Sequence, residues 1–121
     1  MNLSKLLVTA GIVSMCLILP SQLFANGNVE KGADVFEGVC TMCHGEQAQG
    51  GEDFEAPKLA GQYDWYLKTQ LNNFRKGIRG THKDDDNGHV MRPMAMGLSV
   101  QDVDDVVAYI MTLDANFIED D

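Results

Sequence analysis

The feature that most constrains this chain is a pair of cysteines followed directly by a histidine, Cys40-Thr-Met-Cys43-His44. Residues three apart lie on the same side of a helical turn, so both sulfurs can reach one edge of a flat ring system. The spacing C-x-x-C-H is the attachment signature of c-type haem. The sequence therefore predicts one covalent haem c, held by thioethers from Cys40 and Cys43, with His44 as the proximal iron ligand.

Two other kinds of site use paired cysteines at this spacing. A thioredoxin-like redox pair needs a strand-helix-strand frame, and no run of alternating β-branched residues lies near Cys40. A zinc site needs two further ligands at close spacing. His82 and His89 lie in a polar stretch and fit no zinc pattern. Both alternatives are therefore weaker than the haem site.

The N-terminal stretch predicts export. Met1–Lys5 carries a single positive charge, Leu6–Leu19 contains no charged residue, and Ala25 offers a small residue for cleavage. The apolar run is shorter than the roughly 20 residues that span a bilayer. We therefore expect a secretory signal peptide over residues 1–25 rather than an uncleaved anchor. Cleavage after Ala25 removes Cys16 and leaves a mature domain, residues 26–121, in the periplasm.

Composition limits what this domain can bind. The 121 residues include 9 basic and 18 acidic ones, for a net charge of −9. Such a chain lacks the basic face that holds a nucleic acid. At 45% hydrophobic residues it is too apolar for a disordered tail. We expect one acidic globular domain that binds no nucleic acid and retains no stable membrane span after cleavage.

Helical periodicity appears in three segments, and no strand pattern appears. The first helix runs from about Val29 into the cysteine motif, the second covers Tyr63–Lys76, and the third begins at Ser99 with a capping-box variant. Two loops, at about 45–61 and 77–98, are long for so small a domain unless they wrap something. The sequence thus predicts an all-α fold, with three main helices and loops wrapped around the haem.

Apolar positions on these helices define a candidate core. On the second helix they are Tyr66, Leu67, Leu71 and Phe74. On the third they are Val103, Val106, Val107, Ile110 and Leu113, with Tyr109 beside them. Met111 follows on the same helix, and we expect it to pack in the core.

The second axial position on the iron needs its own ligand. A methionine thioether there raises the reduction potential. Met42 lies inside the cysteine motif, but three methionines occupy the loop expected over the distal face: Met91, Met94 and Met96. Spacing alone does not choose among them. His82 and His89 are rival ligands, although their aspartate-rich surroundings favour a solvated loop.

Four stretches carry a resemblance to a known family: Gly32-x-x-x-Phe36-x-x-x-Cys40, the Cys40–His44 motif, Pro57-Lys-Leu-Ala-Gly61-Gln, and Met91-x-x-x-Ala95-x-x-Leu98-Ser99 leading into Tyr109-Ile110. They cover essentially the whole mature chain. It resembles class I bacterial monohaem cytochromes c and the single-haem halves of bacterial dihaem cytochromes c. The resemblance implies the class I cytochrome c fold, in which the first and last helices cross at Gly32, Phe36, Val106 and Tyr109.

The resemblance also selects site residues. In these relatives the distal ligand stands eight residues before the serine that caps the last helix, which implies Met91. Pro57 falls where a proline carbonyl accepts a hydrogen bond from the proximal histidine; a simple turn residue is the alternative. Trp65 and Tyr66 either border the haem or pack in the core. The basic residues expected to offset propionate charge are Arg75, Lys76 and Arg79, whereas Asp84–Asp86 fits no calcium loop.

Function follows from a haem with both axial positions filled. Such a haem has no open iron position for a bound substrate, so we expect a periplasmic carrier of single electrons between respiratory partners rather than an enzyme. One alternative is a cytochrome subunit bound permanently to a dehydrogenase as its electron relay. Another is a small-ligand sensor in which Met91 dissociates. The resemblance implies that Met42 and residues 47–51 and 93–97 ring the exposed haem edge, and because these stretches carry no charge we expect an apolar docking patch there.

Overall fold

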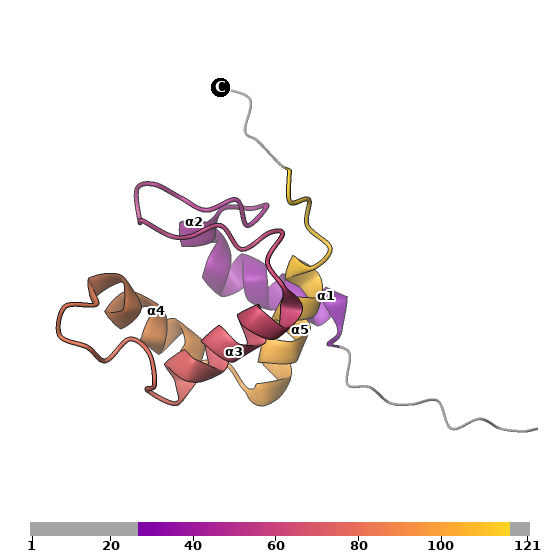
Figure 1. Ribbon diagram of the computed structural model, residues 1–121. Helices are drawn as coiled ribbons and strands as arrows, with labels where there is room; N and C mark the ends of the chain where they lie inside the picture. The colour runs from indigo at the N-terminus through magenta and orange to yellow at the C-terminus, as the bar shows by residue number, and fades with distance from the viewer. Residues whose placement is uncertain (1–26, 117–121) are drawn as a thin grey trace, which may run out of the picture.

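The computed structural model describes residues 27–116 (Figure 1). The order of elements is α1 (Val29–Val35), a π-helical turn (Phe36–Cys40), α2 (Thr41–His44), α3 (Asp64–Arg75), α4 (Asp86–Met96) and α5 (Val100–Ile110). Within the described residues there is no strand, and pairing is limited to one isolated bridge between Gly51 and Ala56. The all-α prediction is confirmed.

The predicted signal peptide, residues 1–25, lies outside the described residues. Across residues 27–116, none of the helices combines the length and the apolar character that a membrane crossing requires.

One continuous helical stretch runs from Val29 to His44, as the sequence predicts. Asn28 caps its start by accepting the Lys31 N–H at 2.9 Å. In the π-helical turn the Thr41 N–H bonds to the Phe36 carbonyl five residues back, and Thr41 Oγ1 donates to the same oxygen at 2.9 Å. A π turn accommodates one extra residue. It therefore changes the direction in which the cysteine motif faces relative to α1.

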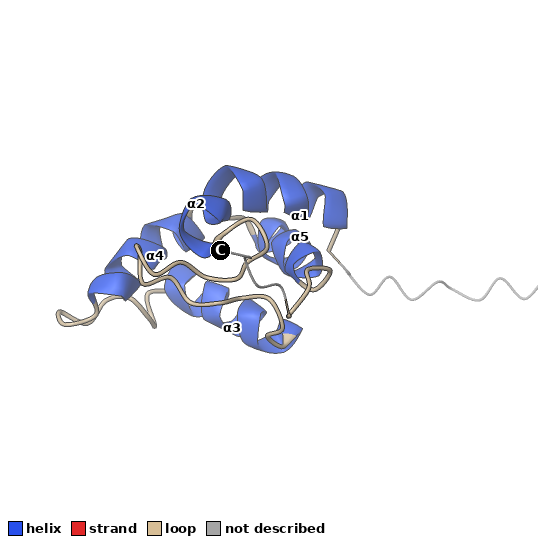
Figure 2. Cartoon of the chain, turned by 90° about the horizontal axis from the view of Figure 1, so that it is seen from above, coloured by secondary structure: helices blue, strands red, loops and turns tan. Residues whose placement is uncertain are grey.

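The first and last helices, α1 and α5, pack against each other (Figure 2). A Cβ atom on Gly32 would lie 2.0 Å from the Asp105 carbonyl oxygen, so only glycine permits this approach. The rings of Phe36 and Tyr109 meet with centroids 5.4 Å apart. Asp105, 1% exposed, accepts the Asn28 N–H at 2.7 Å and ties the start of α1 to α5. The predicted helix contact is therefore present.

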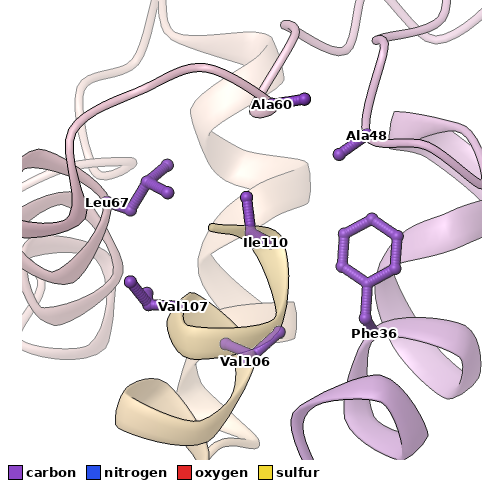
Figure 3. Packing of buried hydrophobic residues seen from close by; sticks show 7 residues of the cluster. All are labelled: Phe36, Ala48, Ala60, Leu67, Val106, Val107 and Ile110. Carbon is purple, nitrogen blue, oxygen red and sulfur yellow. The ribbon is translucent and has the colours of Figure 1, made fainter. Parts of the chain in front are cut away.

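The core joins α3 and α5 to the α1 stretch and the following loop (Figure 3). Its members are buried apolar side chains: Phe36, Ala48, Ala60, Leu67, Val106, Val107 and Ile110. Full burial of a side chain as large as Phe36 contributes roughly 1.5–3 kcal/mol. This core fixes the helices on which the cysteine motif and the methionines stand.

Two predicted helices match closely, and one core assignment, that of Met111, is wrong. α3 begins and ends within one residue of the predicted Tyr63–Lys76, and Ser99 and Asp102 form the capping box of α5. Of the two alternatives for Tyr66, core packing is disfavoured, since its side chain is 38% exposed while α3 buries Leu67 and Phe74. Met111 is 49% exposed because α5 ends at Ile110, so its side chain lies past the packed face.

The prediction of a loop over residues 77–98 is wrong for its second half, which forms α4. The sequence did not predict this helix because it contains Gly88 and Pro93, and both residue types disfavour helix interiors. In the structure Asp85 caps α4 by accepting the Gly88 N–H, and α4 packs along α3. A Cβ at Gly88 would lie 2.0 Å from the Asp85 carboxylate, so a larger residue there would displace the capping side chain.

Candidate functional site

The two cysteines of the motif lie one helical turn apart, Cys40 at the end of the π turn and Cys43 in α2. Both side chains are half-buried. Burial, with a smaller contribution from neighbouring Cys43, raises the pKa of Cys40 to about 11. Redox-active cysteine pairs show the opposite, a depressed pKa. The raised pKa of Cys40 therefore argues against a thioredoxin-like redox pair.

His44 is buried, and its Nδ1 lies 2.9 Å from the Pro57 carbonyl oxygen. A carbonyl only accepts, so Nδ1 carries the proton and the Nε2 lone pair is left for a metal. Burial lowers the pKa of His44, and the Pro57 hydrogen bond partly opposes that shift. The imidazole is thus neutral at neutral pH, as coordination requires.

The loop after His44 brings Pro57 back to the imidazole. Gly45 turns the chain with a φ of +80°, and the Gly50 N–H bonds to the His44 carbonyl at 2.8 Å. Buried Ala48, at a φ of +52°, accepts the N–H groups of Leu59 and Ala60. Because two successive amides converge on one carbonyl, the segment around Pro57 is held against α2.

All three candidate distal methionines stand on α4, which lies beneath α2 at the same end of the molecule (Figures 1 and 2). Met91 is half-buried, whereas Met94 is 44% and Met96 52% exposed. His82 and His89 are exposed, and His89 Nε2 lies 2.9 Å from the His82 carbonyl oxygen. His82 lies in the solvated turn before α4, and His89 lies near the start of α4 on its exposed side.

Three basic residues are expected to offset the charge of the haem propionates. Two of them, Arg75 and Arg79, already have partners within the protein, and the third, Lys76, is exposed. Arg75 Nε donates to the Leu98 carbonyl at 2.9 Å, and Arg79 donates to Gln70 and lies over the Phe74 ring. Trp65 is 62% exposed and stacks on Tyr63, so it is not a core residue.

A further cation, Arg92 on α4, was not singled out in the sequence. Its Nε is buried without a hydrogen-bond partner among the described residues. No sequence pattern marks it, because its burial depends on how α4 packs on the turn after α3.

The donor set fits a covalent haem. Two thiols stand on one helical turn, a neutral imidazole presents Nε2, and a half-buried thioether lies on the facing helix. Apolar side chains remain uncovered near both elements, namely Val39, Met42, Val90 and Met94. A cationic donor is buried nearby in Arg92. In the described part of the chain, no three His, Cys, Asp or Glu residues group together as a separate metal site.

Comparison with known proteins gives a consistent result. The family model for Cytochrome c matches residues 29–114. Cytochrome c-554(547) from Halothiobacillus neapolitanus is 42% identical over 91 residues, which cover 72% of this chain and 98% of that protein. The thiosulfate dehydrogenase electron acceptor from Stutzerimonas stutzeri (strain A1501) is 31% identical, with 88% of this chain and 47% of that protein covered.

A solved structure agrees with these relatives. Reduced recombinant cytochrome c4 from Pseudomonas stutzeri superposes with a TM-score of 0.62 at 31% identity. The match covers 70% of this chain and 47% of that one. The chain therefore spans about half the length of cytochrome c4 and nearly the full length of the shorter relative.

Proposed function

The chain belongs to the cytochrome c family, and from this premise we propose that it is a periplasmic carrier of single electrons with His44 and Met91 as axial ligands. As a family member it binds covalent haem c and serves electron transfer. When bound, the haem iron supplies the redox couple.

The hydrogen bond between His44 and Pro57 is the observation that carries the proposal. It fixes the imidazole tautomer, orients the ring and raises the basicity of Nε2. Cys40 and Cys43 lie within one turn of this imidazole, so attachment and ligation are set by a single helical stretch.

Met91 supports the distal half of the proposal. It is the least exposed of the three α4 methionines, and a soft thioether on the iron raises the reduction potential. With both axial positions filled, no position is open for a substrate, which argues for a carrier rather than an enzyme.

The test is a pyridine haemochrome spectrum together with the intact mass of the periplasmic protein. We expect one haem on a chain that starts at Asn26, with no titratable thiol. One free thiol per chain after denaturation would contradict attachment through both cysteines.

The distal ligand is tested by matched substitutions on α4. Met91→Ala should abolish the sulfur-to-iron absorption band of the ferric protein and lower its potential. Met94→Ala and Met96→Ala serve as controls and should keep both. Loss of the band in Met94→Ala alone would assign the ligand to Met94.

A second candidate is a cytochrome subunit that relays electrons inside a dehydrogenase complex. It is favoured by the relative whose name makes it the electron acceptor of thiosulfate dehydrogenase. Size exclusion of the native protein separates the two, since a free carrier elutes alone and a subunit elutes with its enzyme.

A further inference from the structure

Arg92 is a half-buried cation with one fully buried donor, its Nε, that the described residues leave unpaired. Its Nε is shielded from solvent and has no hydrogen-bond partner in the region 27–116. A guanidinium stays charged at all physiological pH values. Leaving such a donor buried and unpaired costs free energy, so native proteins supply it with an acceptor.

The side chain of Arg92 packs against the turn after α3, at Gly77 and Gly80. A Cβ at Gly77 would lie 3.4 Å from Arg92 Nη2, and one at Gly80 would lie 3.1 Å from Arg92 Cβ. Both glycines have positive φ, +70° and +77°. The turn thus leaves room for the Arg92 side chain beside the end of α3.

The two neighbouring arginines already have interaction partners within the protein. Arg75 is bound to the Leu98 carbonyl and to Asn72, and Arg79 to Gln70 and the Phe74 ring. Among these three arginines, Arg92 therefore has a buried N–H donor that is still available to a bound acceptor.

We infer that Arg92 binds a carboxylate of the haem, one of its two propionates. This inference rests on the proposed function, since it requires the haem c held by Cys40, Cys43 and His44. Arg92 directly follows Met91 on α4, so a side chain as long as arginine can reach the rim of a haem ligated by Met91. A guanidinium matches a carboxylate with parallel N–H donors. In a chain of net charge −9, a partly buried propionate needs such a cation.

The experiment compares holoprotein variants by resonance Raman spectroscopy and redox titration. Arg92→Gln should shift the propionate bending band and lower the reduction potential, because an unneutralised carboxylate favours the ferric iron. Arg92→Lys keeps the charge but lacks Nε, so it should shift the band while retaining most of the potential. Lys83→Gln removes an equal charge from an exposed side chain and should change neither.

An unchanged propionate band in Arg92→Gln, or an equal shift in Lys83→Gln, would overturn the inference and assign Arg92 a purely structural role. If Arg92→Gln does not accumulate, the band of Arg92→Lys decides in the same way. Failure of the proposed function is distinguishable, because the wild-type protein would then lack the haemochrome spectrum.

Discussion

The two sides of the proposed haem site are built by different means. The proximal side, defined here as Val29–His44 and the loop to Ala60, has its cysteines and imidazole within five consecutive residues. The distal side, defined as α3, α4 and the turn between them, holds Met91 through packing of α4 on α3 and through the Arg75–Leu98 hydrogen bond. Residues that are close in sequence, such as Cys40, Cys43 and His44, keep their relative positions when helices shift slightly. The position of Met91 relative to them depends instead on the contacts that hold α4 in place.

The largest effect should come from removing the covalent anchor. A domain of this size buries only roughly 60% of its unfolded surface, and the haem is its largest apolar component. Cys40→Ala/Cys43→Ala protein should lose haem and most of its far-UV circular dichroism. Cys16→Ala, inside the predicted signal peptide, should change neither. A cooperative thermal transition of the double variant at native helicity would show that the distal side folds without the proximal anchor.

The next effect tests the helix crossing that supports the proximal side. Gly32→Ala places a Cβ against the Asp105 carbonyl and should lower the free energy of unfolding by about 1–3 kcal/mol. Gly38→Ala is the matched control, since a Cβ there meets nothing within 4 Å and alanine is the better helix former. Urea denaturation of both holoproteins measures the difference, and equal midpoints would refute the close-approach argument.

A smaller, local effect should follow on the distal side from Arg75→Gln. The substitution removes the donor to the Leu98 carbonyl, at a cost of about 1.5 kcal/mol for a half-exposed charged group. Hydrogen exchange should become faster in α4 and stay unchanged in Val29–His44. Arg79→Gln, which breaks a bond on the exposed surface, is the control. Faster exchange throughout both sides would mean that they form one cooperative unit.

The smallest effect concerns how the two sides share a docking surface. Met42 from the proximal side is 78% exposed, and Met94 from the distal side is 44% exposed. Met94→Lys and Met42→Lys should slow electron exchange with the natural partner more than Asp114→Lys, and the slowing should persist at high salt, where long-range steering is screened. Stopped-flow kinetics at two ionic strengths measures this. Full recovery in salt would show that charge, not the apolar patch, governs docking.

Some of the molecule is determined by the sequence itself. The spacing of Cys40, Cys43 and His44 predicts haem attachment because it depends on one helical turn, and family membership bears it out. The Ser99–Asp102 capping box predicts the start of α5 because a cap is a contact between residues three apart. Such features need only near neighbours, which a sequence displays directly.

Other features were decided by tertiary structure. α4 forms despite Gly88 and Pro93 because it packs on α3, and packing outweighs weak local propensity. The exposure of Tyr66 and Met111 depends on which face of each helix finds a partner. The unpaired, buried Nε of Arg92 arises where α4 meets the turn at Gly77 and Gly80. Burial at such a contact depends on how two segments distant in sequence pack together, so it cannot be predicted from the sequence of either segment alone.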